Sequence, residues 1–500
     1  MSWKRDLHIA VWGERADTAI ERKLIGLDFF ILTYCCISFF FNYLDRAALA
    51  NAYVSGLKED LDFQGAQYNV VVTCLTVGYI VGGPIHGLVI QRISPRVWFS
   101  AMCLLWAGLT MVCAAANSYK HLCVIRFFQG MAEASTYSGA QYIIGSWYKP
   151  QEIGKRTGLF AASGMAGTMF AGLMMTAIYK TVDGHLGLAG WRWLFIILGL
   201  ITLPIAVFGF LFFPDLPQTT RAKWLNAEER ALAISRLPPR QPDAAGRKLG
   251  WSLIRRVLLS PPFWIFTMLW VIGGALESFS IQSCMLLFMK AVKKYSVTQN
   301  NTYPLGITAI GIVSTLVTAV LIDLTGRHMP WGFAACGFQI VATILLLIWS
   351  LPNGAKLVAY YIAGTAYMIQ PVCFTWANKT LAKTGDEAMR ALTLYAMNSG
   401  SSTLFAFWGI ILYPASDAPQ FRKGTIAMFG VIGVLAIWLM ITWRMEIVIN
   451  RRYTEALERD HEEANRERDA ESVDEKKAVA VDRVVQAYEL EQQKGRTAVA

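Results

Sequence analysis

The chain has 500 residues, of which 55% are hydrophobic, 13% aromatic and only 16% charged. A soluble domain carries far fewer apolar side chains, so this composition predicts a protein surrounded by lipid. The net charge of +11 would suit a nucleic-acid partner, but the basic residues lie between apolar runs rather than on one face. The composition therefore excludes a nucleic-acid-binding protein and a soluble enzyme.

All nine cysteines fall inside apolar stretches, where they act as small hydrophobic residues without metal-ligand spacing. We therefore expect no disulfide framework, no metal and no cofactor. We find no pairing of a nucleophile with a base, so a membrane enzyme is not indicated.

Long apolar segments predict the transmembrane helices. A helix needs about 20 mainly apolar residues to cross the bilayer, because each residue advances about 1.5 Å through a core about 30 Å thick. About twelve segments qualify, which predicts an all-α membrane protein with two bundles of six helices. The expected spans are 28–50, 67–90, 97–116, 121–147, 156–179 and 192–213, followed by 263–289, 303–323, 331–350, 355–378, 389–413 and 424–446.

The polar segments between and beyond these spans predict the domains and their orientation. Basic residues gather before the first span, in the loop Lys149–Arg156, in the central stretch and in the tail, so the positive-inside bias places all four in the cytoplasm. Beyond Asn450 the paired charges predict a solvated, partly helical tail. The expected domains are an N-terminal segment 1–27, a bundle 28–213, a central loop 214–262, a bundle 263–446 and a tail 447–500.

Ionisable residues interrupt some of the predicted spans. At membrane depth each costs at least about 2.5–3.5 kcal/mol on insertion scales, so each needs a partner or a water-filled cavity. These residues therefore mark a candidate transport pathway. They are Asp45, Arg46, His86, Arg126, Glu133 and Glu277.

Arg126 and Glu133 share one face of the fourth span. Seven residues return a helix to within about 20° and advance it about 10 Å, so the two cannot pair directly. The planar donor fork of Arg126 suits a carboxylate and predicts an anionic substrate. Glu133 in apolar surroundings favours its protonated form and could carry a coupled proton. Alternatively, each is structural and tied to Asp45 or Arg46 of the first span.

The remaining charges allow more than one interpretation. His86, among the glycines of VGGPIHGLV, is either a packed core residue or a proton relay. Glu277 lies in the seventh span, which faces the central cavity of a two-half transporter, or it caps a break at Gly273 and Gly274. Asp45 and Arg46 could also form a local pair.

Two loops resemble the signature of the major facilitator superfamily, which implies two six-helix halves around a central substrate path. GLVIQRISPR departs from the signature at Gln91, where the family usually has Asp, and at Ser94, where it has Gly; the change at Gln91 weakens the expected contact between helices. LIDLTGRH keeps the pattern. The retained residues, which we expect to act in gating, are Arg92, Arg96, Asp323 and Arg327.

The fourth span resembles the anion:cation symporter branch of that superfamily. RFFQGMAEAS matches its Arg-x-x-Gln-Gly-x-x-Glu pattern from Arg126 through Gln129 to Glu133, and NYLDRAALANA also matches. Arg46 falls on the arginine that faces the substrate path in organic-anion members. NYLDRAALANAYVSGLKEDL and FFPDLPQTTRAKWLNAEERALAISRL resemble the fungal allantoate permease family, and within it the pantothenate:proton symporters most of all.

The resemblance implies proton-coupled uptake of a small organic anion by a monomer in the plasma membrane through alternating access. Pantothenate is the first expectation, with biotin, allantoate and nicotinate as alternatives. A nutrient sensor of the same fold and a carrier without proton coupling also stay open. The candidate substrate-binding residues are Arg46, Arg126, Gln129 and Glu277, and the candidate proton-coupling residues are Glu133, Asp45 and His86.

Overall fold

The computed structural model describes residues 30–64, 67–149, 152–220, 222, 225–235, 251–281, 284–295, 299, 302–414 and 417–497. The chain divides into two compact units, Met1–Met445 and Glu446–Ala500. The predicted N-terminal segment 1–27 and residues 236–250 of the predicted central loop lie outside the described residues.

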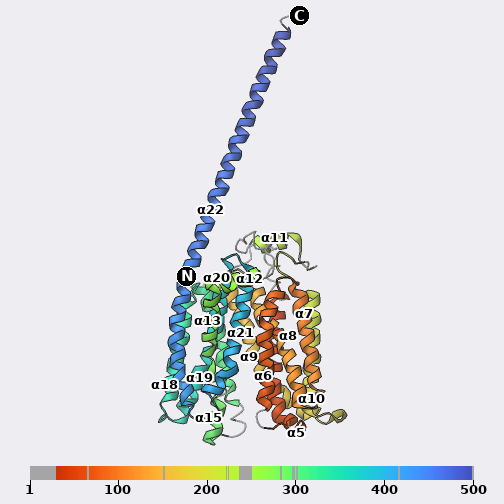
Figure 1. Cartoon of the computed structure of the whole chain (residues 1–500), viewed down its shortest axis with the longest axis vertical. Helices are drawn as coiled ribbons and strands as arrows, with labels where there is room; N and C mark the ends of the chain where they lie inside the picture. Colours follow the sequence, from red (N-terminus) through yellow and green to blue (C-terminus); the bar gives the residue numbers. More distant parts are fainter. Residues whose placement is uncertain are drawn as a thin grey trace, which may run out of the picture. The chain divides into compact units, whose positions relative to one another are not determined.

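All regular structure in the described ranges is helical, and a helix or a series of helices lies at every predicted span (Figure 1). The first half contains α4 (Leu32–Ala52), η1 (Tyr53–Leu57), α5 (Lys58–Asp60), α6 (Gln67–Val89), α7 (Pro95–Cys113), α8 (Tyr119–Trp147), α9 (Ile153–Thr181), η2 (His185–Gly187) and α10 (Gly190–Phe212). Between the halves lie α11 (Ala227–Ser235) and α12 (Trp251–Leu258). The second half contains α13 (Pro261–Ala275), α14 (Ser278–Ile281), α15 (Cys284–Val292), α17 (Leu305–Thr325), α18 (Met329–Leu347), α19 (Asn353–Ala363), η4 (Gly364–Met368), α20 (Ile369–Ala382), α21 (Glu387–Leu412) and α22 (Arg422–Thr497).

Length and composition alone identify eight of these helical segments as membrane spans, or nine if the bent pair α12–α13, with its angle of 63°, counts as one. The other predicted spans, α4, α8 and α21, are helices of 21, 29 and 26 residues. These three helices fail that test because their sequences are more polar. Many of their polar side chains are buried inside the bundle. The spans that are least apolar are therefore the ones that carry the candidate site.

Large apolar side chains on the outside of the first unit explain why it needs lipid. Val124, Phe170, Leu211, Val313 and Ile411 are each more than half exposed. Exposed apolar surface on this scale marks a surface that another apolar phase covers. Since these residues come from helices of both halves, the apolar surface belongs to the whole helical bundle.

Close helix packing fixes the position of α8 against α6. A Cβ atom on Gly78 would lie 2.0 Å from the carbonyl oxygen of Phe127, and one on Gly130 would lie 2.1 Å from that of Leu75. Only glycine permits this approach, as is common where membrane helices pack backbone to backbone. The contact places Tyr79 of α6 beside the charged face of α8.

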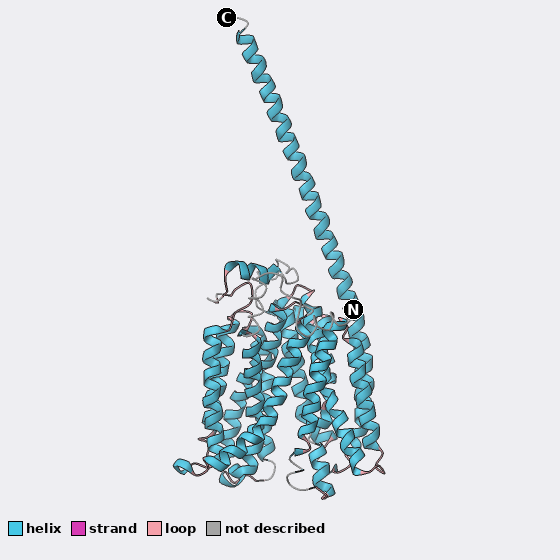
Figure 2. Ribbon diagram, turned by 180° about the vertical axis from the view of Figure 1, so that it is seen from behind, coloured by secondary structure: helices cyan, strands magenta, loops and turns pink. Residues whose placement is uncertain are grey.

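The two halves are bonded to each other where α8 ends and α9 begins, and we call this the closed end. Asn378 of α20 donates to the carbonyl of Gln141 at 3.0 Å, and Ser138 donates to the carbonyl of Leu394 at 3.2 Å. The helices of the two halves converge at this end and diverge toward the other (Figure 2). We call that other end the diverging end.

The second unit, Glu446–Ala500, is helical as far as Thr497. Arg451 pairs with Glu455 one turn later at 2.8 Å, on an exposed surface. This spacing is the usual one for charge pairs along a helix.

Candidate functional site

The centre of the first half holds an ion pair between α4 and α8. Arg46 Nε donates to Glu133 Oε2 at 2.9 Å. Glu133 is fully buried, whereas the Arg46 side chain is 29% exposed. The Arg46 guanidinium also lies over the ring of Tyr79, with 4.4 Å to its centroid. Arg46 therefore neutralises a buried carboxylate while part of its side chain stays exposed, and its Nη2 is buried without a hydrogen-bond partner among the described residues.

Asp45 is the acceptor of a second group of contacts. Its Oδ2 accepts hydrogen bonds from Trp106 Nε1 at 2.9 Å, from the Thr110 hydroxyl and from Gln129 Nε2 at 2.6 Å. Gln129 Nε2 lies 3.1 Å from Glu133 Oε1 as well, so this amide bridges the two carboxylates. A change in the charge of either carboxylate therefore changes the electrostatic environment of the other.

Arg126 is fully buried on the same face of α8. None of its three guanidinium nitrogens has a hydrogen-bond partner in the part of the chain that the structure describes. Its guanidinium lies 5.4 Å from the ring centroid of Phe195 and interacts electrostatically with Glu133. The two arginines and the two carboxylates together carry no net formal charge.

The sequence-based geometry of α8 is consistent with these contacts. Arg126 and Glu133 do not pair with each other, as their separation along the helix predicted. Asp45 and Arg46 bind different partners rather than form a local pair. The Arg46–Glu133 contact is also the one that the structural alternative required, so the contact by itself does not decide between structure and transport.

His86 has both ring nitrogens engaged. Nε2 lies 2.6 Å from the carbonyl oxygen of Met131, and Nδ1 accepts a hydrogen bond from Trp98 Nε1 at 3.0 Å. The proton is therefore on Nε2, because Nδ1 is the acceptor. A second proton on this ring would break the bond to Trp98.

Glu277 lies in the turn that separates α13 from α14. The residue is 6% exposed, and its Oε1 has no hydrogen-bond partner among the described residues. It interacts electrostatically with Tyr43, Tyr137 and Tyr367. The break predicted at the neighbouring glycines is present, and it leaves this carboxyl group inside the bundle.

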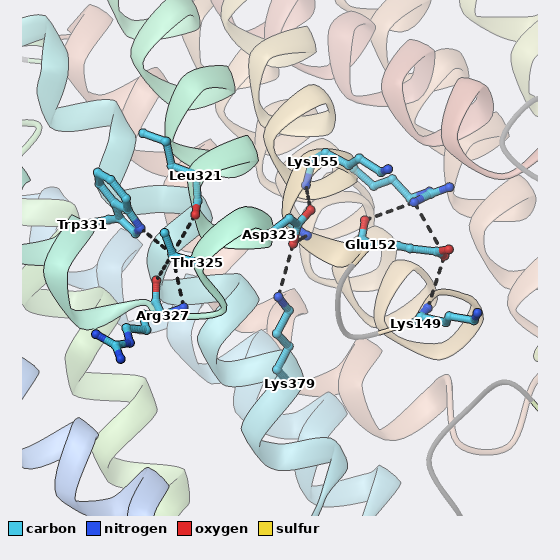
Figure 3. A network of polar contacts seen from close by, with 11 residues as sticks. Lys149, Glu152, Lys155, Leu321, Asp323, Thr325, Arg327, Trp331 and Lys379 are labelled. Carbon is cyan, nitrogen blue, oxygen red and sulfur yellow. Dashed lines mark hydrogen bonds and ion pairs between the residues drawn. The ribbon is translucent and has the colours of Figure 1, made fainter. Parts of the chain in front are cut away.

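One gating candidate of the second half, Asp323, meets the first half at the closed end (Figure 3). Asp323 accepts hydrogen bonds from the backbone N–H groups of Gly154 at 3.1 Å and Lys155 at 2.7 Å, and it pairs with Lys379 at 3.2 Å. An acid at these first amides of α9 also complements the positive end of the helix dipole. Arg327 is exposed, and its N–H lies 3.4 Å from the Thr325 hydroxyl.

The corresponding loop of the first half makes different contacts. The backbone N–H of Arg96 donates to Asp215 at 3.2 Å, and Arg92 is exposed. The first turn of α21 is capped by its own Asp386, which accepts from the N–H of Met389 at 3.0 Å. The helix α21 thus has an ordinary N-cap, whereas α9 receives its acid, Asp323, from the other half.

Arg390 is a residue of the closed end that sequence reasoning missed. It donates to the carbonyl of Gly145 at 2.9 Å and to the Ser146 hydroxyl at 2.6 Å, and it pairs with Glu387. Arg390 is a charge inside the predicted span 389–413, so the rule that flagged Arg126 would have found it. Trp106 and Thr110 carry no comparable signal in the sequence.

Comparison with known proteins identifies the class. The sequence profile of the Major Facilitator Superfamily matches residues 35–410. The chain is similar to the pantothenate transporter liz1 of Schizosaccharomyces pombe (40% identical over 431 residues, covering 86% of this chain and 83% of the relative). It is also similar to the pantothenate transporter FEN2 of Saccharomyces cerevisiae (39% identical over 424 residues, 82% of each chain).

A solved structure agrees on the fold. The proton:xylose symporter XylE superposes with a TM-score of 0.66 at 15% sequence identity, covering 84% of this chain and 96% of that one. The chain therefore belongs to the Major Facilitator Superfamily and has its all-helical fold of two six-helix halves. It is a membrane transporter of small molecules rather than an enzyme, and the predicted resemblance is confirmed.

Proposed function

We propose that this protein takes up pantothenate together with protons across the plasma membrane. The similarity to two pantothenate transporters supports the substrate. The observation that carries the coupling is the Arg46–Glu133 pair, in which a part-exposed cation is held by a fully buried acid. Biotin, allantoate and nicotinate are the alternative substrates, since each offers the same carboxylate chemistry.

Charge balance explains how a proton and an anion would be coupled. With Asp45 and Glu133 ionised, the cluster of these two acids with Arg46 and Arg126 is neutral. A proton on Glu133 removes the acceptor charge that holds Arg46 and leaves the cluster at +1. A substrate carboxylate then restores neutrality, and Arg46 can bind it with its planar fork. Each ligand thus favours binding of the other, as linkage requires.

The remaining residues have supporting roles in this proposal. Gln129 joins Asp45 to Glu133 and transmits the change of charge. Arg126, with its unused donors, becomes a second contact for the anion once the side chains rearrange. Asp45 and His86 are further candidates for the proton, but the two bonds of the His86 ring favour Glu133 as the carrier.

Alternating access would follow from the closed end. Substrate and proton enter from the diverging end while the bonds of Asp323 and Arg390 hold the other end shut. Those bonds then break as the halves rock, and both ligands leave on the far side. We assign the closed end to the cytoplasm and both termini to that side, and we propose that a monomer suffices.

Uptake of labelled pantothenate into cells that lack their own carrier tests the proposal, at several pH values and with an uncoupler. We expect uptake that rises as the outer pH falls and that the uncoupler abolishes. If the cells take up no pantothenate, pantothenate is rejected as the substrate. If they take up none of the carboxylate nutrients, the result indicates a sensor instead of a transporter. Uptake that is indifferent to the uncoupler rejects proton coupling.

A further inference from the structure

Glu277 is a buried acid that forms no ion pair with any described residue. No lysine, arginine or histidine within the described ranges forms an ion pair with it, and its Oε1 accepts no hydrogen bond there. The side chains that interact with it electrostatically include Tyr43 of α4, Tyr137 of α8, Tyr367 of η4 and Cys373 of α20, all uncharged near neutral pH. A buried acceptor left in this condition is costly unless a ligand satisfies it.

The backbone holds this carboxyl group in place. The N–H of Glu277 donates to the carbonyl of Gly274 at 2.9 Å, which closes the last turn before the break. Gly274 lies against α21, since a Cβ there would be 2.6 Å from the Ser401 hydroxyl. Non-helical backbone at membrane depth is tolerated where it is buried in protein or lines a cavity. The break therefore gives Glu277 a fixed position inside the bundle.

Tyr43 connects Glu277 to the cluster of the first half. Its ring centroid is 5.6 Å from the Arg46 guanidinium, and the same tyrosine interacts with Glu277. The Arg46 guanidinium of the first half and the Glu277 carboxyl group of the second half thus both interact with the same tyrosine. A solute held between them meets positive charge at one end and a hydrogen-bond acceptor at the other.

We propose that Glu277 is the specificity-determining residue for the end of the substrate that lies away from its carboxylate. Its carboxyl oxygens accept hydrogen bonds from hydroxyl or N–H groups there, and at alkaline pH, where the group is ionised, it also repels a second carboxylate. The substrate class is therefore monocarboxylates that carry hydrogen-bond donors at the opposite end. This inference rests on the proposed function, because Arg46 must bind the carboxylate.

Pantothenate fits that class, since it has one carboxylate and, at the other end, two hydroxyl groups. Two kinds of competitor separate the two roles of Glu277. Adipate offers a second carboxylate, and hexanoate offers neither a second charge nor a donor. A site built to bond a donor rejects analogues that lack it far more strongly than a purely apolar site does, and a like charge adds repulsion.

The test is competition for uptake of labelled pantothenate by wild type, Glu277→Gln, Glu277→Leu and the control Glu229→Gln. Glu229 is also buried but caps α11 through the N–H of Asn226, far in sequence from the cluster. In wild type and control we expect both competitors to be at least about tenfold weaker than pantothenate itself. At alkaline pH, where Glu277 of the wild type is ionised, we expect adipate to improve by about tenfold or more in Glu277→Gln while hexanoate stays weak. In Glu277→Leu we expect the KM for pantothenate to rise about tenfold or more and hexanoate to gain.

An unchanged ranking of the competitors in both variants overturns the inference. So does a shift of the pH profile in Glu277→Gln without a change in ranking, since this result would make Glu277 a proton carrier instead. If wild type fails to take up pantothenate, the proposed function fails first. The same compounds are then ranked by the shift they cause in the unfolding temperature of the purified proteins. Variants that shift this ranking as described support the role of Glu277, and variants that do not shift it reject that role.

Discussion

Replacing Glu133 by Gln removes the charge that holds Arg46 and keeps the shape of the side chain. The contact joins Arg46 Nε and Glu133 Oε2 at 2.9 Å, with one partner fully buried and the other 29% exposed. Two unit charges about 4 Å apart attract by about 4 kcal/mol at an effective dielectric constant of 20. Exposure of Arg46 reduces this value, and hydrogen bonds to charged groups contribute about 1.5–3 kcal/mol net.

This energy is what a substrate carboxylate has to overcome when it takes Arg46 away from an ionised Glu133. In Glu133→Gln the competition is absent, so pantothenate should bind about ten- to a hundredfold more tightly at alkaline pH. Affinity should also lose most of its dependence on pH. The variant imitates the protonated state permanently, so uptake should no longer follow the proton gradient.

Titration of purified protein with pantothenate between acidic and alkaline pH measures this effect. Glu229→Gln is the matched control, because it makes the same chemical change at a buried acid outside the cluster. Wild type and control should lose affinity as the pH rises, and Glu133→Gln should not. Equal pH dependence in all three proteins would refute the assignment of Glu133 as the proton carrier.

Three further changes address the other parts of the account. Arg126→Lys should weaken pantothenate binding by about tenfold without moving the pH dependence, because a lysine lacks the planar fork; equal affinity would exclude Arg126 from the anion site. Asp323→Asn removes the charge that binds the Gly154 and Lys155 amides and Lys379, which weakens the closed end by about 1.5–3 kcal/mol. Thiol labelling of a cysteine placed at the buried Ala140 of α8 should therefore accelerate about tenfold or more, and unchanged labelling would contradict this role. Burial, together with the nearby Lys379 and Lys383, lowers the pKa of His328 well below its ordinary value, so the unfolded chain binds a proton below about pH 6.5 that the folded chain does not. Stability should therefore fall on acidification, by up to about 1.4 kcal/mol per pH unit from this residue, and His328→Asn should flatten that fall in thermal unfolding, whereas an equally steep fall would rule out His328 as its source.

The sequence predicts the helices well because their signal is local. Twenty apolar residues cross a bilayer whatever surrounds them, and every predicted span contains a helix in the structure. The break in the seventh span was also predictable, because Gly273 and Gly274 precede Glu277. Most of the candidate residues were predictable as well, because an ionisable side chain inside an apolar span can be recognised without knowledge of its neighbours.

Partners across the bundle could not be predicted in the same way. Arg46 and Glu133 are 87 residues apart, and their pairing depends on how α4 packs beside α8. Trp106 and Thr110 bind Asp45 through neutral groups that look like any other residues of an apolar span. The bond of Arg96 N–H to Asp215 joins residues 119 positions apart and could not be read from the family pattern. These features depend on tertiary contacts, so only the structure reveals them.

Proton movement during transport tests the central claim most directly. Purified protein is placed in liposomes that contain a pH-sensitive dye, and pantothenate is added outside without any imposed gradient. The account predicts that the interior acidifies as pantothenate enters, and that Glu133→Gln carries pantothenate without acidification. Entry of pantothenate through the wild-type protein with no change in internal pH would contradict proton-coupled uptake.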